Sequence, residues 1–225
     1  MSDEGPITRP SLTTPRSAAI AGIAFALLLG LAIVMLRLSI PAGAGEDTTW
    51  LTDTAKRRSV GLAINLVPFA GIAFLWFIGV IRDRIGAHED RFFATVLLGS
   101  GLLFVAMLFV AAALALALRV EVSSAAGSVV TSDAWRVDAR LTSLLMSIYA
   151  MRMAAVFTIS VATIALRTGV IPKWLAYSGY ASGLLLLVSV GLTPWIHLLF
   201  PLWILLLSVH ILRRSWATPP RLREG

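Results

Sequence analysis

The chain has 225 residues, of which 58% are hydrophobic and only 14% are charged. A soluble domain of this size needs far more charge to cover its surface, so the composition excludes an ordinary water-soluble enzyme or binding domain. The formal net charge of +7 does not predict nucleic-acid binding, because the basic residues lie at the ends of apolar runs, where they act as topology signals.

The first apolar run follows a polar segment at residues 1–16, which we expect to be a disordered cytoplasmic tail. The run covers residues 17–38 and exceeds the roughly 20 residues that one bilayer crossing needs. The small residues Ala42-Gly43-Ala44 resemble a signal-peptide cleavage site, but the apolar run is long for a signal peptide. We therefore expect an uncleaved first span.

Three further apolar runs, at residues 59–81, 92–118 and 141–166, are each long enough for one crossing. The last apolar stretch, from Trp174 to Leu212, contains no Asp, Glu, Lys or Arg and is nearly twice the length of one crossing. The turn sequence around Gly191 divides it into two predicted spans.

The sequence therefore predicts an all-α polytopic transmembrane bundle of six spans. The last two spans are expected at residues 173–192 and 195–212, so the transmembrane domain covers residues 17–212 and a cytoplasmic tail covers residues 213–225. No stretch outside the apolar runs is long enough to form a soluble core of its own.

The distribution of lysine and arginine predicts the orientation of the six spans. Eleven basic residues flank the spans on the side of the two termini, and six on the opposite side. The positive-inside rule then places both termini in the cytoplasm, although the cluster Lys56-Arg57-Arg58 on the opposite side argues against this. The preference for arginine over lysine, with abundant alanine, valine, leucine and glycine, is typical of GC-rich bacterial genomes, so we expect a bacterial inner membrane.

Arg152 lies near the middle of the fourth predicted span. Arginine at a helix centre costs roughly 2.5–3.5 kcal/mol on insertion scales, and no Asp or Glu occurs within the predicted spans to compensate it. Candidate partners are hydroxyls such as those of Tyr149 and Thr163, a freed carbonyl, water or a bound anion. One interpretation is an anion-attracting site, and the other is a structural arginine that bonds carbonyls or snorkels outward. Both predict that Arg152 faces protein rather than lipid.

Pro68 and Pro201 lie within the second and sixth predicted spans, where each is expected to kink the helix. Asn65 adds a polar side chain about one turn before the first of these kinks. Broken helices expose backbone groups to substrates or ions in transporters, but they also occur in membrane helices that have no such role. Both interpretations stay open.

Gly179 and Gly183 form a GxxxG pair in the fifth predicted span, with Ser178 and Ser182 offset by one residue. Small residues at this spacing let two helix backbones approach closely, so this face is predicted to pack against another helix. The pattern does not distinguish a helix of the same chain from one in a second copy.

His88, His197 and His210 are the three histidines. The last two lie thirteen residues apart in the sixth span, which is a spacing that could place axial ligands for two stacked haems. The alternative is two interfacial histidines without a cofactor. No HExxH or GxSxG sequence and no pair of intramembrane carboxylates occurs, so the sequence offers no catalytic or metal site.

The sequence GVIRDRIG at residues 79–86 resembles part of the cytoplasmic signature of the major facilitator family, through Gly79, Asp83, Arg84 and Gly86. In that family the motif latches helix ends through charge pairing. Here Ala87-His88-Glu89 replaces the basic end of the motif, and the chain has about half the family's length. The alternative is a salt-bridged cytoplasmic turn in which Arg82 and Arg84 act as stop signals.

The segment RDRIGAHEDRFFATV at residues 82–96 is also similar to small multi-pass bacterial membrane proteins of unknown function, actinobacterial ones among them. That resemblance rests mainly on hydropathy and implies no activity.

We expect a non-enzymatic membrane protein without a cofactor, which contacts the lipid bilayer and acts through helix–helix contacts as a homo-oligomer or as part of a larger complex. A small transporter or channel with a polar midplane site at Arg152 is the alternative. A haem-binding electron carrier is the third interpretation. No nucleic-acid partner is expected.

Overall fold

The computed structural model describes residues 15–39, 53–85, 91–124, 133–188 and 194–217. Every regular element within these ranges is a helix, which confirms the prediction of an all-α protein. In chain order the elements are α1 (Pro15–Ser39), α2 (Thr54–Ile85), α3 (Arg91–Ser124), α4 (Asp133–Leu144), the π-helix η3 (Leu145–Tyr149), α5 (Ala150–Thr168), α6 (Lys173–Val188), the 3₁₀-helix η4 (Pro194–Leu198) and α7 (Leu199–Ala217).

Five helical segments among the described residues are long and apolar enough to cross a membrane: Arg16–Ser39, Thr54–Arg82, Phe92–Val120, Val137–Thr168 and Trp195–Trp216. They correspond to the first four predicted spans and the last one. The fifth predicted span is represented by α6, whose 16 residues rise about 24 Å. The rest of that prediction, residues 189–192, lies outside the described residues. These helices are those of a multi-pass membrane protein.

Several helices are longer than the apolar runs that predicted them. Asp53 caps α2 by accepting hydrogen bonds from the backbone N–H of Ala55 and Lys56, so the helix begins before its apolar stretch. In the fourth span, α4, η3 and α5 form one uninterrupted helical stretch from Asp133 to Thr168. It ends at Gly169, whose φ of 65° is the left-handed conformation that glycine adopts most readily.

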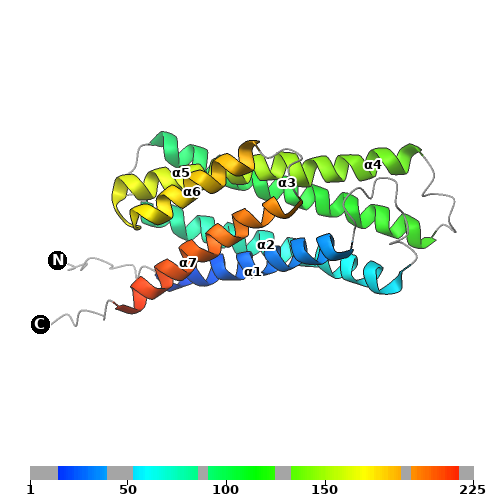
Figure 1. The fold of residues 1–225 in the computed structure, drawn as a ribbon, viewed down its shortest axis with the longest axis horizontal. Helices are drawn as coiled ribbons and strands as arrows, with labels where there is room; N and C mark the ends of the chain where they lie inside the picture. Colours follow the sequence, from blue (N-terminus) through cyan, green and yellow to red (C-terminus); the bar gives the residue numbers. More distant parts are fainter. Residues whose placement is uncertain (1–14, 40–52, 86–90, 125–132, 189–193, 218–225) are drawn as a thin grey trace, which may run out of the picture.

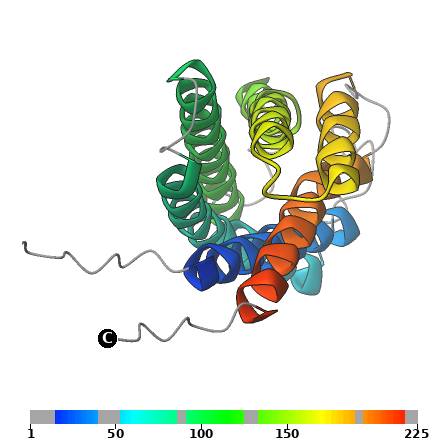
Figure 2. The same ribbon diagram turned by 90° about the vertical axis from the view of Figure 1, so that its left-hand side faces the viewer.

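The helices form a closed ring in which each packs against its neighbours in the order α1, α2, α3, α5, α6, α7 and back to α1. Successive helices run in opposite directions along the long axis, and α1 begins at the same end of the bundle at which α7 finishes (Figure 1). Viewed along that axis, the chain follows the ring from α1 to α7 (Figure 2). We call the end at which α1 begins the terminal end, and the other the far end.

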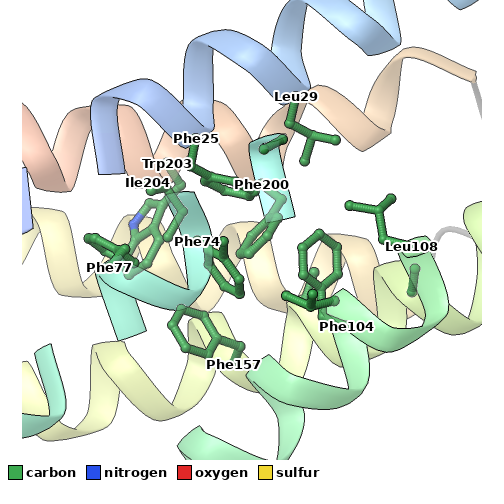
Figure 3. Close-up of a cluster of buried hydrophobic side chains, with 14 of the residues drawn as sticks. Phe25, Leu29, Phe74, Phe77, Phe104, Leu108, Phe157, Phe200, Trp203 and Ile204 are labelled. Carbon is green, nitrogen blue, oxygen red and sulfur yellow. The ribbon is translucent and has the colours of Figure 1, made fainter. Parts of the chain in front are cut away.

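Phenylalanine side chains fill the centre of this ring, as the close-up in Figure 3 shows. Phe25 of α1, Phe74 of α2, Phe104 of α3, Phe157 of α5 and Phe200 of α7 are each fully buried. Phe74 contacts the other four, with ring centroids 4.5–5.6 Å apart, and most of these pairs meet edge to face. Such geometry is favourable for aromatic quadrupoles. The five rings join five helices from across the sequence and close the centre of the bundle at their level.

The two prolines predicted to kink their spans occupy different positions in their helices. Helix α2 is continuous through Pro68, which is exposed on its surface. Pro201 lies in the first turn of α7, just after η4 and within the segment Trp195–Trp216. A backbone N–H in the first turn has no intrahelical partner, so proline costs little there.

Candidate functional site

The π-helix η3 is the main irregularity among the described helices, and one of its carbonyls takes part in a polar contact that joins three spans. The backbone N–H of Ala150 bonds to the carbonyl of Leu145, five residues earlier, instead of four. This pattern adds one residue to a helical turn, and single π-helical turns often occur at functional sites. The segment lies near the middle of the long helix α4–η3–α5.

On the inward side of η3, His197 of η4 joins two other elements. Nη2 of Arg37, at the end of α1, lies 2.9 Å from Nδ1 of His197, and Nε2 of His197 lies 3.3 Å from the carbonyl oxygen of Ser147 in η3. We call this the Arg37–His197–Ser147 bridge. It connects the first, fourth and sixth spans near one level of the bundle.

The chemistry of the three groups fixes the state of the imidazole in this arrangement. Arginine only donates hydrogen bonds, so Nδ1 of His197 must present its lone pair to Arg37. Nε2 then carries the proton and donates it to the Ser147 carbonyl. His197 is therefore neutral here, and both of its nitrogens are used in holding helices together.

On the outward side of the same helix lies Arg152, one turn after Ser147. Its side chain is exposed, as is that of Tyr149, whereas Ala150, Met151 and Ala154 beside them are buried. Within the part of the chain that the structure describes, no hydrogen bond or ion pair reaches the Arg152 side chain. The expectation that Arg152 faces protein is not met by the bundle itself, because the residue projects away from the other helices.

Thr163, a predicted partner of Arg152, and Asn65, the polar residue before the first predicted kink, are both engaged elsewhere. Thr163 donates to the carbonyl of Ile159 or pairs with the hydroxyl of Tyr180 on α6, each at 2.8 Å. Asn65 is exposed on α2, where its amide donates to the carbonyl of Gly61. The structure therefore does not bring Arg152, Thr163 and Asn65 into one site.

The GxxxG pair packs within the chain, between α6 and its neighbours. A Cβ atom at Gly183 would lie 2.6 Å from the Ile159 side chain and 3.2 Å from the carbonyl oxygen of Ala155 in α5. One at Gly179 would lie 2.7 Å from Trp203 of α7. Ser178 bonds back to the carbonyl of Leu175, and Ser182 is half-buried beside the pair. Close approach of α5 and α6 therefore depends on the two glycines.

His210 lies in α7 and does not share a site with His197. Its Nε2 atom is buried and has no hydrogen-bond partner among the described residues. The two nitrogens of His197 are taken by the bridge, so the arrangement offers no free axial ligand at that position for a haem. Within the described ranges, no group of three or more His, Asp or Glu side chains is placed to hold a metal ion.

The charged turn predicted at residues 82–86 falls partly outside the described residues. Arg82, Asp83 and Arg84 are in the last turn of α2, so these residues are helical rather than part of a loop. Gly86 and His88 lie outside the described residues. The alternatives of a latch and a salt-bridged turn stay predictions.

Sequence reasoning missed Arg37 and Ser147. Arg37 lies at the end of the first predicted span, where a basic residue is an ordinary boundary signal, and Ser147 has no distinctive sequence context. One signal was available in the sequence. Arg37 closes the first predicted span and His197 begins the sixth, and the even number of crossings between them places both residues on the same side of the membrane.

Comparisons with known proteins add no assignment. No family model matches the chain, no curated protein matches it, and no solved structure matches its fold.

Proposed function

We propose that this protein is a non-enzymatic subunit of a membrane complex, which docks a partner membrane helix on the outward face of α5. The observation that carries the proposal is the exposed position of Arg152, near the centre of the segment Val137–Thr168. Charged side chains at such depth in a membrane almost always face protein or water, because burying an unpaired guanidinium in hydrocarbon is costly. A second protein on this face would supply the missing environment.

The closed centre of the bundle favours this proposal over a transporter or channel. A path along the bundle axis would have to pass the buried ring of Phe25, Phe74, Phe104, Phe157 and Phe200. Arg152 lies outside that ring and projects away from it. A cation that attracts substrate anions into a central path would be expected on the inward face of its helix.

The membrane and the orientation of the protein are proposed from the sequence composition and from the distribution of basic residues. We infer a bacterial inner membrane with both termini in the cytoplasm, because the terminal end of the bundle carries the larger number of basic residues. Arg37 lies near the far end and adds one basic residue there, but the terminal end still carries more basic residues than the far end.

Cysteine accessibility tests the proposal, since the natural chain has no cysteine. Tyr149→Cys and Val156→Cys would place a thiol one turn before and one turn after Arg152. Leu103→Cys on α3 and Leu184→Cys on α6 serve as matched controls, because both side chains are exposed and lie within apolar helices. Each variant would be treated with a membrane-soluble and with a membrane-impermeant thiol reagent, in native membranes and after purification.

If a partner covers Arg152, the two α5 thiols are protected in native membranes and react with the soluble reagent after purification, while the controls react in both. Reaction of the α5 thiols with the impermeant reagent in native membranes would indicate water at this depth and support the transporter alternative. Equal reaction with the soluble reagent before and after purification would mean that the face meets only lipid, and the docking proposal would be wrong.

A further inference from the structure

A second arginine, Arg119, lies at the far end of the bundle, where it packs against a neighbouring helix, unlike Arg152. Its guanidinium rests directly on the backbone of Gly61 in α2, in the space that a Cβ atom at residue 61 would occupy. Gly61 is buried, whereas the Arg119 side chain is exposed on its other side. The absence of a side chain at residue 61 therefore lets the guanidinium of one helix lie flat against the next.

The surroundings of this guanidinium are cationic and polar. Arg57 and Arg58 are exposed and precede Gly61 by one helical turn on α2. Asn65 is exposed one turn beyond Gly61 and donates one amide hydrogen to the Gly61 carbonyl at 3.0 Å, which leaves its second amide hydrogen available. Within the described residues, no hydrogen bond or ion pair engages the side chains of Arg57, Arg58 or Arg119.

Arg119 differs from three other arginines of the bundle, which have partners inside the protein. Arg37 bonds His197, Arg167 lies 4.6 Å from the ring centroid of Phe93, and Arg214 donates to the carbonyl of Val170. Arg119 packs on Gly61 and is exposed to the outside, and within the described residues its donors have no hydrogen-bond partner. A fixed guanidinium with open donors and like-charged neighbours is a site for an anion rather than a structural contact.

The depth of the site indicates which anion it meets. The apolar segment of α3, Phe92–Val120, has 29 residues and rises about 43 Å. A whole bilayer with its headgroups is about 40–45 Å thick, so the two ends of this segment reach the headgroup layers. Arg119 is the residue before the last in this segment. Its level is that of the lipid phosphates.

We propose that Gly61 and Arg119, with Arg57, Arg58 and Asn65 around them, bind the phosphate of an anionic phospholipid in the leaflet at the far end of the bundle. The guanidinium would donate to two phosphate oxygens, and Asn65 would donate from the deeper side. The neighbouring arginines favour a lipid with net negative charge over a zwitterionic one. This site is independent of the docking face on α5.

Native mass spectrometry of the purified full-length protein would test this inference, with phosphatidylglycerol and phosphatidylcholine of identical acyl chains offered in equal amounts. Wild type should retain one phosphatidylglycerol molecule in preference to phosphatidylcholine. Arg119→Gln should lower that preference about tenfold, as expected for the loss of one charge-assisted, bidentate contact. Arg119→Lys should lower it less, because the charge remains and the fork is lost.

Gly61→Ala is the critical variant, because it keeps every charge and displaces only the flexible end of Arg119. We expect it to lower the preference nearly as much as Arg119→Gln, with an unchanged unfolding temperature. Arg213→Gln, which removes an exposed arginine at the terminal end, should leave the preference within about twofold of wild type.

Three results would overturn the proposal. Wild-type lipid preference in Gly61→Ala would show that the position of the guanidinium does not matter. An equal loss in Arg213→Gln and Arg119→Gln would show that the protein attracts anionic lipid only through its overall charge. Displacement of the bound phosphatidylglycerol by inorganic phosphate at millimolar concentration would assign the site to a free anion instead of a lipid.

Discussion

The two faces of α5 differ in the contacts that they make with the other helices of the chain. The inward face makes several contacts. Phe157 packs in the phenylalanine cluster and against Gly101 of α3, and the Ala155 carbonyl lies against Gly183 of α6. One turn before the helix lies the Arg37–His197–Ser147 bridge. The outward face carries Arg152 and makes none of these. The contrast indicates that the inward face is complete within the fold, whereas the outward face is finished by something else.

Removal of Phe157 should have the largest effect. Phe157→Ala would leave a cavity beside Phe74 and Phe200, and buried phenylalanine-to-alanine changes cost about 3–5 kcal/mol. The unfolding temperature in a fixed detergent would measure the loss, and Phe157→Leu should recover most of it. An unchanged unfolding temperature in Phe157→Ala would contradict the close packing of the five phenylalanine rings.

Gly183→Ala should have the next largest effect, about 1–3 kcal/mol, because the added methyl group meets Ile159 and the fixed carbonyl of Ala155. Gly99→Ala is its control, since a Cβ atom at that helical position meets nothing within 4 Å. The control should be neutral or more stable by up to about 1 kcal/mol, as alanine favours helix over glycine. Equal effects of the two substitutions would contradict the close approach of α5 and α6.

His197→Ala should cost about 1–3 kcal/mol, because it leaves the guanidinium of Arg37 and the carbonyl of Ser147 without their shared partner. The same substitution in an Arg37→Met background should cost clearly less, and this difference measures the coupling between the two side chains. Additive effects in the double-mutant cycle would show that Arg37 and His197 act independently.

Arg152→Gln should have the smallest effect on the purified monomer, within about 0.5 kcal/mol, because the side chain is exposed and has no hydrogen bond or ion pair within the described residues. Arg37→Gln, at an arginine that does have a partner, is the comparison. In native membranes Arg152→Gln should have the larger effect of the two variants, because it weakens the contact with the partner. Blue native electrophoresis would show this as a loss of the assembled complex. Marked destabilisation of the purified Arg152→Gln monomer would place this side chain in the packed interior.

The overall architecture follows from the sequence because length and hydropathy alone decide it. Apolar runs of about 20 residues have few alternatives to a membrane helix, since every backbone group must be paired within the bilayer. The helix ends were less predictable. The extension of α2 back to Thr54 depends on a cap by Asp53, and the extension of α3 to Ser124 crosses the charged residues Arg119 and Glu121.

The candidate sites depend on rotation and register, which hydropathy does not encode. Arg152 could be placed at a depth but not on a face, because the long helix contains a π-helical turn that shifts the phase of everything before it. The contacts of Gly61 with Arg119 and of Arg37 with His197 join residues 58 and 160 positions apart. GxxxG spacing predicted the packing of Gly179 and Gly183, but only the structure identifies α5 and α7 as the helices they meet.

The π-helical turn is also the place where this long helix can change its length without changing its faces. The wider turn takes up one extra residue, so losing one residue from Leu145–Tyr149 would let an ordinary α-helix run through while α4 and α5 kept nearly the same relative rotation. A helix turns by about 100° per residue, so losing one residue elsewhere between Asp133 and Thr168 would rotate the part before the deletion by about that angle. Arg140 would keep its neighbours after the first deletion, and it would point to different ones after a deletion in the ordinary helix between it and Leu145.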